Sequence, residues 1–108
     1  MFDKFRDMAN RFDEIDRLIS DPVIAGDPQK ASALMKERAR ISKWASKYRE
    51  FESTLKRKVE SAEMVRTEKD PEMKAMAQEE LGQLTEAEGR MRHELEEELL
   101  SSDQDSAR

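Results

Sequence analysis

The sequence predicts an all-α fold: a long antiparallel helical hairpin, coiled-coil-like, with a shorter N-terminal helix packed on its base. Of its 108 residues, 42% are charged and 36% hydrophobic, and there are only three glycines, three prolines and no cysteines. Alanine, glutamate, lysine, leucine and arginine make up roughly half of the chain, which is typical of long helices and coiled coils. Each proline follows an aspartate, and no glycine or proline lies between Pro28 and Pro71.

The first helix is predicted from about Phe2 to Ile19, because apolar residues recur there every three or four positions. They are Phe2, Phe5, Ala9, Phe12, Ile15, Leu18 and Ile19. Ser20-Asp21-Pro22 ends this helix. The connector that follows, Val23 to Gly26, has room for about one helical turn.

Two longer helices are predicted over residues 28–68 and 71–100. Asp27 and Asp70 can cap them, since an aspartate accepts hydrogen bonds from first-turn amides and a proline fits the first helical position. The second helix would be on the order of 60 Å long, too long for the first to cover. We therefore expect a helical N-terminal domain at residues 1–100, with a three-helix base and a two-helix arm ending at residues 66–71. Residues 101–108 are polar and are expected to form a linker or frayed tail.

The hairpin prediction rests on pairing residues across the fold-back at Lys69-Asp70. One constant register matches apolar residues over about seven steps, the spacing of a coiled-coil seam. The pairs are Val65 with Met73, Ala62 with Ala77, Val59 with Leu81, Leu55 with Leu84, Tyr48 with Met91, Ala45 with Leu95 and Ile41 with Leu99. Residues 28–69 carry 12 basic and 6 acidic side chains and residues 70–108 carry 4 and 12, within a net charge of −5. Opposite charges beside a seam favour this pairing. It places Lys56, Arg57 and Lys58 near Glu79 and Glu80, and Arg40 and Lys43 near Glu96, Glu97 and Glu98.

Apolar residues outside this seam are interpreted as core. Trp44 and Phe51 lie seven residues apart and would pack near Phe2 and Phe5; a partner-binding aromatic patch is the alternative. The methionines at or near apolar stripes are expected to fill gaps in a thin core, rather than to form a partner-binding groove. They are Met8, Met35, Met64, Met73, Met76 and Met91.

No residue pattern points to catalysis. His93 is the only histidine and lies among arginine and glutamates, so we interpret it as solvated. No phosphate-binding loop, Ser-His-Asp set or metal-ligand spacing is present, and we expect no enzyme activity, cofactor or metal. No apolar run reaches membrane-spanning length and no signal-peptide core is evident, so we expect a cytoplasmic protein without a membrane partner.

Basic residues on the arm are the candidate binding residues. Lys56, Arg57 and Lys58 could contact RNA phosphates, but nearby glutamates are expected to neutralise them. At the arm tip, Arg66, Lys69 and Lys74 are the site prediction, with RNA contact and neutralisation left open. Two functions follow from the residues alone: a free-standing RNA-binding helical arm, or a structural coiled-coil adaptor.

One stretch resembles a known family. Residues 70–81 read Asp-Pro-Glu-Met-Lys-Ala-Met-Ala-Gln-Glu-Glu-Leu, which resembles a run in the N-terminal domain of bacterial peptide chain release factor 1. Residues 18–22, Leu-Ile-Ser-Asp-Pro, resemble the segment that closes that family's first helix. Tyr48-Arg49-Glu50 and Leu99-Leu100 also fit.

The resemblance implies a role in translation termination in the cytoplasm. It implies docking at the large-subunit stalk base, the region of ribosomal protein L11 and its rRNA, and interplay with the GTPase release factor. The family's codon-reading Pro-x-Thr motif and its Gly-Gly-Gln hydrolysis motif are absent from this sequence. The resemblance therefore implies a domain fragment that keeps a docking role without the family's catalytic residues.

Overall fold

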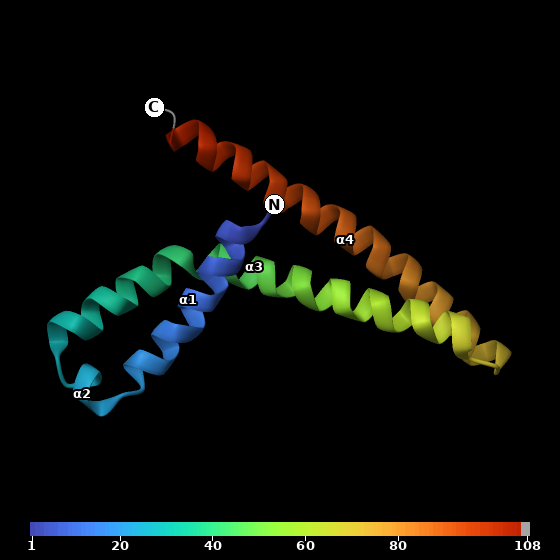
Figure 1. Cartoon of the computed structure of the whole chain (residues 1–108), viewed down its shortest axis with the longest axis horizontal. Helices are drawn as coiled ribbons and strands as arrows, with labels where there is room; N and C mark the ends of the chain where they lie inside the picture. The colour runs from blue at the N-terminus through green and yellow to red at the C-terminus, as the bar shows by residue number, and fades with distance from the viewer. Residues whose placement is uncertain (107–108) are drawn as a thin grey trace. The chain divides into compact units, whose positions relative to one another are not determined.

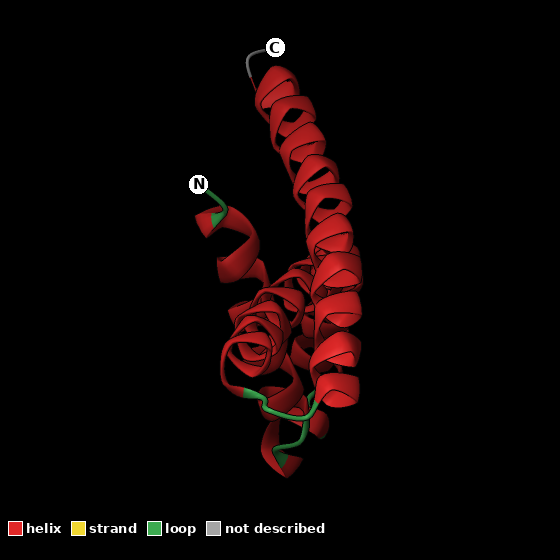
Figure 2. Ribbon diagram, turned by 90° about the vertical axis from the view of Figure 1, so that its right-hand side faces the viewer, coloured by secondary structure: helices red, strands yellow, loops and turns green. Residues whose placement is uncertain are grey.

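The computed structural model describes residues 1–106, with side chains to residue 103, and all elements in this range are helices (Figures 1 and 2). They are α1 (Asp3–Ile19), α2 (Pro22–Ala25), α3 (Pro28–Thr67) and α4 (Pro71–Ser106). The predicted all-α class and the three long helices are confirmed, and the connector contains one short helix. α4 continues beyond the expected end at Leu100, because residues 101–106 contain no glycine or proline to stop it. Residues 107–108 of the predicted tail lie outside the described residues.

Asp27-Pro28 and Asp70-Pro71 start helices as predicted, and Asp21-Pro22, which was expected to end the first helix, also starts α2. Each aspartate carboxylate accepts a backbone amide hydrogen bond from within the next three residues. The pairs are Asp21 with Val23 at 2.9 Å, Asp27 with Lys30 at 3.3 Å, and Asp70 with Glu72 at 3.1 Å. These bonds satisfy amides that have no partner inside the helix.

The chain forms two compact units, Met1–Arg49 and Glu50–Arg108, and α3 contributes to both. In the first unit α1 runs antiparallel to the first part of α3 (Figure 1). Its buried residues are Phe2, Phe5, Ala9, Ile15, Ile41 and Ala45. The Phe5 ring centroid lies 6.0 Å from that of Phe2 and 5.7 Å from that of Trp44, so this part of the predicted aromatic core is confirmed.

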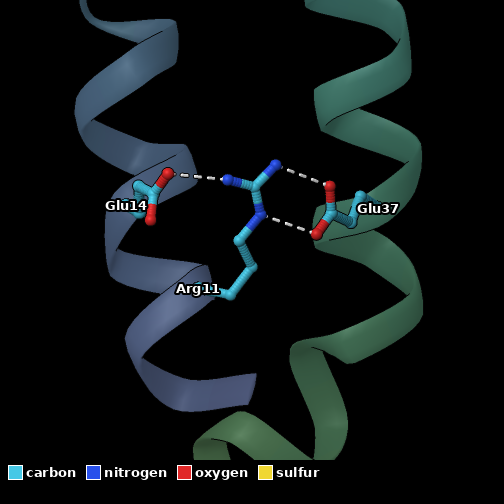
Figure 3. Close-up of polar contacts among 3 residues, drawn as sticks. All are labelled: Arg11, Glu14 and Glu37. Atoms are coloured by element: carbon cyan, nitrogen blue, oxygen red, sulfur yellow. Dashed lines mark hydrogen bonds and ion pairs between the residues drawn. The ribbon is translucent and has the colours of Figure 1, made fainter. Parts of the chain in front are cut away.

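Arginine–carboxylate pairs join α1 to α3 in this unit. Arg11 donates two hydrogen bonds to Glu37, at 2.7 and 2.9 Å, and a third to Glu14 at 2.8 Å (Figure 3). These bonds lower the pKa of Glu37 and raise that of Arg11. Two further pairs are Arg38 with Asp16, at 2.7 Å, and Arg49 with Asp13, at 2.8 Å.

The second unit is an antiparallel hairpin of α3, from Glu50, with α4; we call it the arm. Its buried residues are Phe51, Thr54, Ser61, Ala77, Leu84 and Leu95. The Thr54 hydroxyl lies 3.4 Å from the Met91 sulfur, and the Lys58 ammonium lies 3.0 Å from the Glu88 carboxylate. The bond from Lys58 lowers the pKa of Glu88. The predicted hairpin is confirmed, as is the contact of Arg57 with Glu80, at 3.1 Å.

The predicted seam is confirmed in part. Ala77, Leu84 and Leu95 are buried as expected, but Val59 is 70% exposed and Ala62 is exposed, although both were placed in the seam. Thr54 and Ser61, which lie outside the predicted pairs, are buried, and Thr54 and Lys58 contact Met91 and Glu88 of α4. An alignment of apolar residues alone misses these polar positions, which follow Phe51 at the same three- and four-residue spacing.

The Asp70 cap can be tested by substitution. Asp70→Ala removes the acceptor for the Glu72 amide and is expected to lower the free energy of unfolding by about 1 kcal/mol. Urea unfolding followed by far-UV circular dichroism measures this loss. Asp70→Asn is the matched control, because asparagine caps a helix about as well as aspartate. If asparagine costs as much as alanine, the carboxylate acts through its charge and not as a cap.

The observed seam makes a second prediction. Val59→Lys should change the free energy of unfolding by less than about 0.5 kcal/mol, since the side chain is already in water. Leu84→Ala removes a side chain that is 5% exposed and should cost about 2–4 kcal/mol. Urea unfolding compares the two variants. Equal losses would place Val59 in the seam and contradict its observed exposure.

The Arg11–Glu37 pair makes the first unit sensitive to acid. Because the pKa of Glu37 is lower in the folded chain than its ordinary value of 4.5, its stabilising effect is complete above that pH. The effect is lost as the pH falls through the lowered pKa. The melting temperature of the wild type should exceed that of Glu37→Gln at neutral pH, and the difference should vanish in acid.

Glu60→Gln is the control for this pH series. Glu60 is exposed and has no ion-pair partner among the described residues. Its substitution should produce a small, constant difference in melting temperature across the same pH range. A Glu37→Gln difference that also stays constant with pH would rule out the ion pair as its cause.

Candidate functional site

The arm tip is a turn held by its own acidic side chains. The Glu68 carboxylate accepts hydrogen bonds from the backbone amides of Lys69 and Asp70, both at 3.1 Å. The Thr67 hydroxyl donates to the Glu63 carbonyl at 2.9 Å, where α3 ends. Asp70 caps α4, so two of the acids at the tip are engaged with backbone amides.

The three predicted site residues lie at this tip, but they differ in their surroundings. Arg66, in the last turn of α3, is 70% exposed and is paired with Glu63 on the same helix. Lys69, in the turn, and Lys74, near the start of α4, are both exposed. Among the described residues neither lysine has an ion-pair partner. Only Lys69 and Lys74 therefore present unpaired positive charge.

The tip as a whole is acidic. Residues 60–79 contain three basic and six acidic side chains. A nucleic-acid surface is usually a basic patch, so the two lysines are isolated cations on an acidic surface.

Exposed methionines are the feature of the tip that sequence reasoning missed. Met64, Met73 and Met76 are 41%, 40% and 65% exposed, and Met35 in the first unit is 47% exposed. The gap-filling interpretation is therefore wrong for these four. Met64 also lines a shallow groove together with Arg57, Glu60, Ser61 and Glu80. Flexible, polarisable methionines adapt to a partner surface, so the tip combines apolar and charged contacts suited to binding.

The other residues considered in the sequence contribute less to a site. Arg57 and Lys58 are neutralised by Glu80 and Glu88, as the alternative to RNA contact predicts. His93 is 74% exposed, with its Nε2 3.7 Å from Glu97. Within the described part of the chain, no group of three or more His, Cys, Asp or Glu side chains is placed to hold a metal. None of the described helices has the length and apolar character needed to cross a membrane.

Comparison with known proteins gives matches over nearly the whole chain. The PCRF domain model matches residues 8–108. Peptide chain release factor 1 of Levilactobacillus brevis is 32% identical over 103 residues, 95% of this chain and 28% of the relative. That of Chlorobaculum tepidum is 32% identical over 108 residues, 100% of this chain and 30% of the relative. That of Lachnoclostridium phytofermentans is 38% identical over 81 residues, 75% of this chain and 23% of the relative.

The chain thus spans less than a third of the length of these relatives. No solved structure gives a significant match. The matches confirm the resemblance to bacterial peptide chain release factor 1 that residues 70–81 indicate. The chain belongs to the PCRF domain family.

Proposed function

We propose that this chain acts in translation termination, in the cytoplasm, as the ribosome-docking domain of a class I peptide chain release factor. The observation that carries the proposal is the PCRF match over residues 8–108, together with relatives that are named peptide chain release factor 1. Because the chain corresponds to under a third of those relatives, the proposal assigns to it a docking role and not the hydrolysis reaction of the whole factor.

The arm supports a binding role. Its tip presents Lys69 and Lys74 as exposed cations beside exposed Met73 and Met76. Methionine side chains suit a protein surface and lysines suit phosphates. A mixed partner of protein and RNA would use both kinds of contact at once.

We assign the docking partner to the large-subunit stalk base, as the family resemblance implies. This region combines ribosomal protein L11 with rRNA, and the GTPase release factor is a further candidate partner there. Arg66, Lys69 and Lys74 are the proposed contact residues at the tip. Arg66 would have to exchange its bond to Glu63 for one to the ribosome.

Cosedimentation with purified ribosomes tests this function. The double variant Lys69→Ala, Lys74→Ala should weaken binding about twofold to thirtyfold, since each exposed charge contact contributes about 0.2–1 kcal/mol. The matched control is Lys30→Ala, Arg90→Ala, which removes the same charge from exposed positions away from the tip and should bind like the wild type. Failure of the wild-type chain to sediment with ribosomes, or equal binding to ribosomes that lack protein L11, would contradict the proposal.

A further inference from the structure

Positive charge is concentrated on the part of α3 that belongs to the first unit. Residues 28–49 contain seven basic side chains and one acidic side chain. Four of the basic residues recur at intervals of four, three and four, which places them on one face of the helix. They are Lys36, Arg40, Lys43 and Lys47, and we call them the basic stripe. The stripe extends over about 16 Å along the helix axis.

The basic stripe lies on the face of α3 that points away from α1. Ala45 is 2% exposed and lines a groove together with Ala9 and Phe12 of α1. Nine residues separate Lys36 from Ala45, and nine residues correspond to two and a half helical turns. Lys36 therefore points to the side opposite the packed face, and Lys36, Arg40 and Lys43 are all exposed.

The cations of this unit fall into two groups. Those that join α1 to α3 are paired: Arg11 with Glu37, Arg38 with Asp16 and Arg49 with Asp13. By contrast, neither Lys36 nor Arg40 forms an ion pair in the described part of the chain, although the Arg40 charge contributes to the lowered pKa of Glu37. Asp13 and Asp16 of α1 thus neutralise cations on the inner face of α3, whereas the stripe on the outer face stays charged.

An aromatic side chain borders the stripe. The Trp44 ring is half-buried against Phe5, at 5.7 Å between centroids. The Lys43 and Lys47 ammonium groups lie 5.2 and 5.9 Å from its centroid. These distances allow cation–π contacts. Trp44 therefore packs beside the two C-terminal lysines of the stripe.

We infer that the basic stripe binds the phosphate backbone of RNA, with Lys36, Arg40 and Lys43 as the contacting cations. A row of exposed cations along a straight helix matches a row of phosphates and needs no base contacts. The inference rests on the proposed function, which it deepens: it places an RNA contact on α3 in the first unit, whereas the tip is acidic overall. An acidic protein surface is the competing partner that the experiment must distinguish.

Fluorescence anisotropy with a labelled RNA stem-loop, over a series of salt concentrations, tests the inference on the whole chain. The triple variant Lys36→Ala, Arg40→Ala, Lys43→Ala should bind at least about tenfold more weakly at low salt. The slope of log affinity against log salt should fall by about two to three, one for each lost phosphate contact. Far-UV circular dichroism establishes that the variant keeps its helices.

The matched control is Arg17→Ala, Lys30→Ala, Arg90→Ala, which removes three exposed cations outside the stripe and the tip. It should keep the wild-type slope. An equal loss in both variants would show a general charge effect and overturn the inference. Absence of RNA binding by the wild type at low salt would also overturn it, as would stripe-dependent binding to polyglutamate that exceeds binding to the RNA.

Ribosome cosedimentation separates this inference from the function on which it rests. If the stripe variant sediments with ribosomes like the wild type, the stripe is not a ribosomal RNA contact and the inference fails, while the docking function stands. If the wild type does not sediment at all, the docking function fails. Reduced sedimentation of the stripe variant, with normal sedimentation of the control, supports both.

Discussion

The aspartate–proline step is the constraint on which the other features of this chain depend. A residue that precedes proline is disfavoured in the helical region, and proline itself has no amide to donate, so a helix cannot pass through such a step without a break. The aspartate carboxylate then accepts an amide hydrogen bond from the first turn of the next helix, as Asp27 and Asp70 do. Between these two steps nothing interrupts the helix, and the length of α3 and the position of the arm tip follow from their spacing.

The seam of the arm is thin, and its polar contacts help to select one pairing of α3 with α4. Two helices can bury only one stripe each, and in the arm that stripe includes Thr54, Ser61 and the Lys58–Glu88 pair. Replacing such a pair with apolar residues often does not destabilise a protein, so its value lies less in net stability than in register. A lysine opposite a glutamate penalises the alternative registers, in which either charge would face an apolar side chain.

The helix ends and the hairpin could be predicted from the sequence, but the exact face of α3 that enters the seam could not. Helix ends follow from short-range chemistry, which is why the bounds at Ile19, Pro28 and Pro71 agree with the prediction. The register depends on which of several similar faces of α3 meets α4, and apolar residues such as Val59 favoured the wrong one. The site prediction shows the same division: Lys69 and Lys74 are exposed at the tip, but the exposure of Met73 and Met76 depends on which face of α4 packs against α3.

The distribution of paired and unpaired cations connects the fold to a binding role. A cation that already bonds a carboxylate must give up that bond before it can contact a partner. Arg11 and Arg38 therefore stabilise the first unit, and their charges are not free to bind a ligand. Lys36, Lys69 and Lys74 have no ion-pair partner among the described residues, and each can release condensed counterions from a phosphate when it binds. Each unit has one group of such cations, although the net charge of the chain is negative. A polyanion would be attracted to these cations and repelled by the acidic side chains elsewhere on the chain. Orientation on the partner would then be determined by where the unpaired cations lie, and not by the overall charge of the chain.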